Sequence, residues 1–198
     1  LRIRAELMTR FLREIRAMLN EVGEAQGRHI PSCYLVPIHN IPHETWAQAG
    51  TALEESMANA LDIRTWIREE LVDYLVVHLH VYGEHDGTQS QSLIRQITEL
   101  ARGTKTKVYI DIYPRRMPPR KYRQIAMSYY EAGADGLAFW DSYNRYFRAS
   151  EWATITRLGH RDELAGWEGI GDDHHRVVPL KRLDGISAGH AFSLPSDG

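Results

Sequence analysis

The sequence predicts an α/β fold in which one leading helix is followed by four strand–helix units of a parallel β/α barrel, half the number in a closed barrel. Short apolar segments alternate with amphipathic segments, as parallel crossovers require. The segments that follow the strands are long and polar, while those that follow the helices are short. This asymmetry, and the lack of a glycine-rich phosphate loop after any strand, favour a barrel over a doubly wound sheet.

The composition is that of an ordinary globular domain of 198 residues, with 43% hydrophobic and 25% charged residues. A formal net charge of -2 provides no basic stripe, so we expect neither nucleic acid nor a membrane as a partner. No apolar run reaches the roughly 18 residues of a membrane helix. The one cysteine, Cys33, can form no internal disulfide, which excludes a disulfide scaffold, and we interpret it as a core residue.

The leading helix is predicted over residues 1–27 and ends at Gly27, where a left-handed residue is favoured. Its apolar residues recur every three or four positions and are expected to form one buried face, made by Ile3, Leu7, Phe11, Ile15, Leu19 and Val22. No capping residue precedes this pattern. We therefore expect the helix to begin upstream of Leu1, and the cellular location stays open.

The first two units follow this helix. Ile30–Ile38 is the first predicted strand, and a long connection follows it with a helical piece over Glu44–Asn59. Asp62 is expected to cap the next helix. That helix buries one face, made by Ile63, Trp66, Ile67 and Leu71. The second strand, Tyr74–Val81, is apolar enough to be buried on both faces.

The last two units repeat this order. A helix over Ser92–Ala101 leads to a strand over Lys107–Tyr113, and Pro118 and Pro119 then open the next helix. This helix is expected to bury Tyr122, Ile125, Ala126 and Tyr129. The fourth strand is Gly136–Trp140, and short helical pieces follow it.

The chain is predicted to divide into a half-barrel domain over 1–167 and a loop-rich extension over 168–198. The extension is rich in Gly, Asp, Ser and Pro, residues that favour turns.

Several segments resemble the family 10-like glycosyl hydrolase-like barrel proteins of bacteria, namely TKVYIDIYPRRMPP, YYEAGADGLAFWDS, RLGHRDELAGW and ALDIRTWIREELVDYLVV. The resemblance covers about residues 1–180. It implies the C-terminal half of a TIM-type (β/α)8 barrel, with the four strands as the fifth to the eighth. It also implies a glycoside hydrolase whose acidic motif at the end of the fourth strand lies upstream of Leu1, so that this chain would be an incomplete catalyst.

Three acidic residues are the catalytic candidates, because glycosidases use two carboxyl groups about 5–10 Å apart. Asp111 shares one side of its strand with Tyr109, and that side is expected to face the barrel lumen. Asp141 follows the fourth strand, and Glu84 lies in the loop after the second. The alternatives are a buried structural role for Asp111, a turn-forming role for Asp141 and a solvated position for Glu84.

The substrate-binding candidates surround the same lumen. His78 and His80 alternate along one face of their strand and are expected to point into the lumen near its top. The others are Tyr113, Arg115, Trp140, Tyr143 and Asn144. Trp140 has a core role as its alternative, and Arg115 a surface role.

The sequence thus predicts a glycoside hydrolase-like protein that acts on or binds a carbohydrate substrate and uses no cofactor. One alternative is a non-catalytic carbohydrate-binding or assembly module. Another is a metal-dependent barrel enzyme, for which His78 and His80 would begin the ligand set. Because a half barrel has open edges, we also expect either a homodimer through those sheet edges or poor solubility.

Overall fold

The structure is a computed structural model that describes residues 2–39, 56–57, 59–80, 91–111, 119–139 and 158–167. Its strands are β1 (Cys33–His39), β2 (Tyr74–His80), β3 (Lys107–Asp111) and β4 (Gly136–Ala138). Its helices are α1 (Arg2–Ala25), α3 (Ile63–Arg68), α4 (Gln91–Ala101), α5 (Pro119–Glu131) and α7 (Arg161–Trp167). The helical piece expected over Glu44–Asn59 and the extension over 168–198 fall almost entirely outside these residues.

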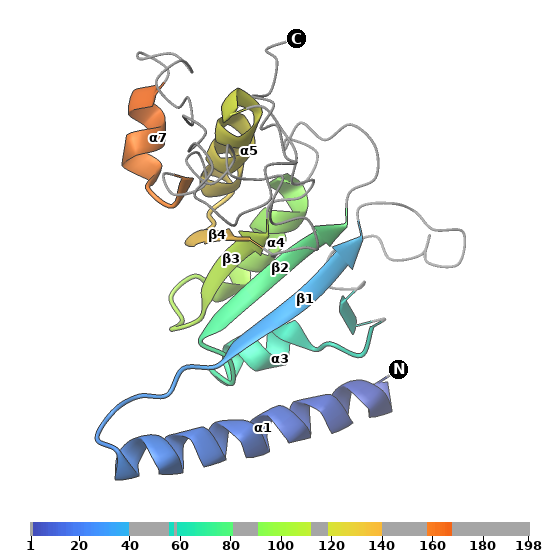
Figure 1. Ribbon diagram of the computed structural model, residues 1–198. Coiled ribbons are helices and arrows are strands. Elements are labelled where there is room, and N and C mark those ends of the chain that lie inside the picture. Colours follow the sequence, from blue (N-terminus) through green and yellow to red (C-terminus); the bar gives the residue numbers. More distant parts are fainter. Residues whose placement is uncertain are drawn as a thin grey trace, which may run out of the picture.

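The four strands form one parallel sheet in the order β1-β2-β3-β4, which confirms the predicted α/β class (Figure 1). The order follows the chain without a reversal. The helix pairs α1–α3, α3–α4, α4–α5 and α5–α7 are in contact, so the helices form one continuous layer in chain order. Right-handed crossovers between neighbouring parallel strands produce this arrangement, because each one places its helix on the same face of the sheet.

The two faces of the sheet differ as the sequence predicts for the second and third strands. The helix-covered face is buried at Val36, Ile38, Leu75, Val77, Leu79, Val108 and Ile110 and partly buried at Tyr34 and Leu137. The other face, which we call the open face, carries Leu35, Tyr74 and Tyr109, and the first two are exposed. Cys33 begins β1 on this open face and is also exposed, so its interpretation as a core residue is wrong.

The prediction for the leading helix is correct in its end at Gly27 but wrong in its buried face. Ile3, Leu7, Phe11 and Val22 are exposed. The buried side is instead made by Ala5, Thr9, Leu12, Arg16 and Gly23. Polar contacts select this side: the Trp66 Nε1–H donates to Thr9 Oγ1 at 3.0 Å, and Arg16 reaches the strand connections.

The helices end where the sequence places their stop signals. Asp62 caps α3, since its Oδ1 accepts from the Thr65 N–H at 3.1 Å. Gly27 and Gly133 have positive φ, and the next residue in each case bonds back to a carbonyl five residues earlier, at 3.0 and 3.1 Å. Glu70 ends α3 in the same left-handed conformation with φ 51°, although it has a side chain that this conformation disfavours.

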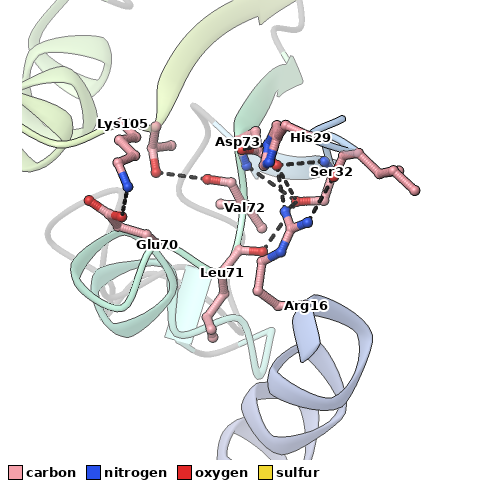
Figure 2. Close-up of polar contacts among 10 residues, drawn as sticks. Arg16, His29, Ser32, Glu70, Leu71, Val72, Asp73 and Lys105 are labelled. Carbon is pink, nitrogen blue, oxygen red and sulfur yellow. Dashed lines mark hydrogen bonds and ion pairs between the residues drawn. The ribbon is translucent and has the colours of Figure 1, made fainter. Parts of the chain in front are cut away.

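The Asp73 carboxylate joins α1 to the amino ends of β1 and β2. Figure 2 shows Arg16 reaching it from α1, with Arg16 Nη1 donating to Asp73 Oδ2 at 2.7 Å. The Ser32 backbone N–H donates to the same oxygen at 2.7 Å, and His29 Nε2 lies 2.7 Å from Oδ1. Arg16 Nη2 also donates to the Ile30 carbonyl at 2.8 Å. The Arg16 side chain is only 10% exposed, so its charge depends on this partner.

Burial alone raises the pKa of Asp73. The hydrogen bonds from the Ser32 N–H and from His29 outweigh burial and hold the pKa below its usual value. The folded state therefore binds the proton less readily than the unfolded state. The stabilisation from this carboxylate is present above the unfolded pKa of about 4 and is lost as the pH falls through the folded pKa.

We predict that Asp73→Asn lowers the free energy of unfolding by about 2–3 kcal/mol at pH 7, because it leaves the Arg16 guanidinium buried without an anionic partner. Urea unfolding between pH 7 and pH 3 measures this. The difference between wild type and variant should shrink below about pH 4. Glu21→Gln on the exposed side of α1 is the control, with an expected change within about 0.5 kcal/mol. A pH-independent difference would contradict the role of the ionised carboxylate.

We predict that Glu70→Gly raises the free energy of unfolding by about 0.5–1 kcal/mol, because glycine removes the left-handed strain. The variant loses an ion pair to Lys105 at 3.0 Å, but this pair is exposed and contributes little. Thermal unfolding should show a rise of roughly 2–4 °C. Glu70→Gln keeps the strain and removes the charge, so it should leave the melting temperature nearly unchanged; a rise equal to that of the glycine variant would refute the explanation by strain.

Candidate functional site

Two predicted site residues meet at the carboxyl ends of β2 and β3. His78 and Asp111 are register partners across the two strands, and the same row continues to Pro37 of β1 and Ala138 of β4. Both side chains belong to the open face by the period of two. His78 is 7% exposed and Asp111 is 1% exposed, so the pair is buried although it carries polar and charged groups.

A hydrogen bond joins the two side chains, with His78 Nδ1–H donating to Asp111 Oδ2. An ionised carboxylate only accepts, so the bond assigns the proton to Nδ1. The Nε2 atom then lies on the opposite side of the ring from Asp111. A carboxylate that fixes an imidazole in this way sets both its tautomer and its orientation, which proton transfer and metal binding each require.

Tyr129 of α5 lies within the electrostatic reach of this pair. Burial raises the pKa of its phenol, and the negative charge of Asp111 raises the pKa further. Both effects favour the protonated, neutral form of the Tyr129 phenol. The neutral phenol of Tyr129 and the imidazole of His78 therefore both lie near the negative charge of Asp111.

Two tyrosines precede the pair along the open face of the same two strands. Tyr74 and Tyr109 pack edge to face with their ring centroids 5.6 Å apart. The Tyr109 ring also lies against Gly136, its register partner in β4, where an added Cβ would be 2.4 Å from Tyr109 Cε1. Glycine at 136 is therefore what allows the ring to lie flat across β4.

The structure brings together His78 and Asp111 but leaves the other predicted site residues untested. His80 is the last residue of β2, two residues after His78. The remaining candidates lie outside the described residues: Glu84, Tyr113, Arg115, Trp140, Asp141, Tyr143 and Asn144. The sequence analysis missed Tyr129 as a neighbour of Asp111, because its helical spacing is that of an ordinary core residue.

Comparisons with known proteins add no assignment, since no protein-family model and no curated protein matches the chain. Within the described ranges, no three His, Cys, Asp or Glu side chains gather closely enough to hold a metal ion. In the same part of the chain, no helix combines the length and apolar character needed to cross a membrane.

Proposed function

We propose that this chain is the substrate-lining part of a glycoside hydrolase-like β/α barrel and that the His78–Asp111 pair belongs to its active site. The observation that carries the proposal is this buried pair at the carboxyl ends of neighbouring parallel strands. Active sites of β/α folds form at that end of the sheet. Burying a charged pair is costly, and packing alone would be served as well by apolar side chains, so a catalytic use explains the pair better.

Two features of the sheet support the barrel. The strand order has no reversal, and the helices form one layer in chain order, as in consecutive units of a (β/α)8 barrel. The open face also carries exposed apolar side chains, Leu35 and Tyr74, which a closed barrel would bury in its interior. The four described strands are half of the eight that closure needs, so in this proposal four further strands complete the lumen.

The geometry gives the two side chains different roles in the proposed reaction. Asp111 is proposed to act through His78, to which its carboxylate is hydrogen-bonded, which makes it a positioning residue. His78 then uses Nε2 to exchange a proton with a sugar hydroxyl or a water molecule. Glu84 or Asp141, which follow β2 and β4, is proposed to supply one of the two carboxyl groups that flank the glycosidic bond, and the acidic motif that the resemblance places upstream of Leu1 is proposed to supply the other. Binding of the sugar is proposed for His80, Tyr113, Arg115, Trp140, Tyr143 and Asn144.

We predict that Asp111→Asn and His78→Gln each weaken oligosaccharide binding at least tenfold in calorimetry. Each should lower any turnover of aryl glycosides about 10²–10⁴-fold, and the double variant should be no worse than the more impaired single variant, because the residues act as a unit. The matched control is Asp135→Asn. That carboxylate accepts from the Val108 N–H at 2.9 Å at the opposite end of the sheet, so its loss should lower stability without changing binding.

The binding and turnover measurements distinguish the catalytic proposal from its alternatives. Binding without turnover would support the non-catalytic carbohydrate module instead. Binding that is unchanged in Asp111→Asn would remove the pair from the site. Neither binding nor turnover with any oligosaccharide tested would reject the carbohydrate function altogether.

A second candidate is a metal-dependent barrel enzyme, which the same hydrogen bond favours. Metal-binding histidines commonly donate their second ring N–H to a carboxylate, as His78 does to Asp111. His78 Nε2 and His80 would then supply the first two ligands. Elemental analysis after dialysis against Zn²⁺ or Mn²⁺ tests this: we expect stoichiometric metal in the wild type and its loss in His78→Gln. A metal-free wild type after both treatments would dispose of this candidate.

A further inference from the structure

Helix α1 carries an exposed apolar stripe on the side turned away from α3 and the sheet. The stripe consists of Ile3, Leu7, Phe11, Met18 and Val22, which are 79%, 54%, 55%, 54% and 40% exposed. At 3.6 residues per turn these five positions share one side of the helix, about 150° from its buried side. Figure 1 shows α1 along one edge of the molecule, with α3 and β1 on its inner side.

The stripe is larger than scattered surface residues would make it. With roughly 200 Å² for a fully exposed side chain of this size, it presents about 550 Å² of mainly apolar surface. Patches of that extent on a folded protein mark interaction sites. Two copies of the stripe would bury about 1,100 Å², which exceeds the roughly 1,000 Å² expected of a specific interface.

The stripe is complementary to itself in an antiparallel pair. Its ends, Ile3 and Val22, are apolar and similar in size, and its midpoint falls next to Phe11. A two-fold axis at that midpoint sets Ile3 of one copy beside Val22 of the other, and Leu7 beside Met18. The two Phe11 rings then meet close to the axis, where the centre of a symmetric interface is best shielded from water.

The charges in and beside the stripe fit the same arrangement. Arg10 borders it, and Glu14 lies within it between Phe11 and Met18; both are exposed, and neither forms an ion pair with another described residue. In the antiparallel pair, Arg10 of each copy lies opposite Ile15 of the other and next to Glu14, so the contact forms twice. By contrast, Arg13 and Arg16 are already paired with Glu69 and Asp73 on the inner side of the helix.

The sheet edges are less suited to self-association than this stripe. Pro37 lies within the edge strand β1 and has no backbone N–H to offer an incoming strand. The other edge strand, β4, has only three residues. Short strands and prolines at sheet edges are typical devices against strand addition.

We propose that a second copy of this chain packs on the α1 stripe, forming an antiparallel two-fold dimer of α1 helices rather than a dimer through the sheet edges. The inference uses no residue of the His78–Asp111 site, and it places a second copy where the proposed barrel would have the unit that precedes α1. Sedimentation equilibrium of the 198-residue chain from about 1 to 100 µM should therefore show a reversible monomer–dimer equilibrium.

Phe11→Lys is expected to raise the dimer dissociation constant at least about 100-fold, because the change acts twice near the symmetry axis. Ala17→Lys, on the exposed surface of α1 outside the stripe, is the matched control and should change it less than threefold. Circular dichroism confirms that each variant is folded. The single variants Arg10→Glu and Glu14→Arg should weaken the dimer about tenfold, and the double variant should restore it.

Restoration by the double variant would establish the antiparallel register, since non-specific aggregation has no reason to respond to a charge swap. A chain that stays monomeric at 100 µM would overturn the proposal. So would a dimer that Phe11→Lys leaves intact but that Leu35→Lys on the open face disrupts, because that result moves the interface to the sheet.

Discussion

The Asp73 carboxylate is the contact on which the arrangement of the described elements depends, because it is shared by three segments that are distant in sequence. Arg16 approaches it from α1, the Ser32 N–H from the start of β1, and Asp73 itself begins the connection into β2. The guanidinium is nearly buried and has no alternative anion within reach in the described structure. The energetic cost of separating such a charge from its partner fixes α1 against the amino end of the sheet, and apolar packing then fills the space between them.

Aspartate residues have different roles at the two ends of this parallel sheet. At the amino ends, the first backbone N–H groups of the strands need acceptors, and Asp73 and Asp135 take them at 2.7 and 2.9 Å. At the carboxyl ends, the strands present carbonyl oxygens, so a carboxylate must find its donor among side chains. Asp111 finds it in His78. The position of an aspartate along its strand therefore distinguishes Asp73 and Asp135, which have structural roles, from Asp111, which is the candidate for a role in the active site.

The sequence was sufficient where the signal is local. The period of two in β2 and β3 gives the correct faces, and the Asp62 cap gives the start of α3. It was insufficient for α1, which has apolar residues on two sides, because the side that is buried is chosen by contacts with Trp66 and Asp73, 57 residues away in the chain. The His78–Asp111 pairing depends on the β2–β3 register, which no local pattern specifies. Glu84, Asp141 and the other residues of the long loops stay predictions.

The orientation of α1 also indicates which kind of surface packs on its outer side. The outward stripe is more apolar than the inner side, which includes Ala5, Thr9 and Arg16. Burying the stripe would contribute at most on the order of 10 kcal/mol by area, whereas removing the Asp73 partner of Arg16 is expected to cost about 2–3 kcal/mol. Hydrophobic burial alone would therefore favour a helix rotated to place the stripe on the sheet. The observed orientation of α1 is the more stable one under two conditions: the polar contacts form on its inner side, and a second apolar surface covers its outer side. Both sides of the helix are then in favourable contacts.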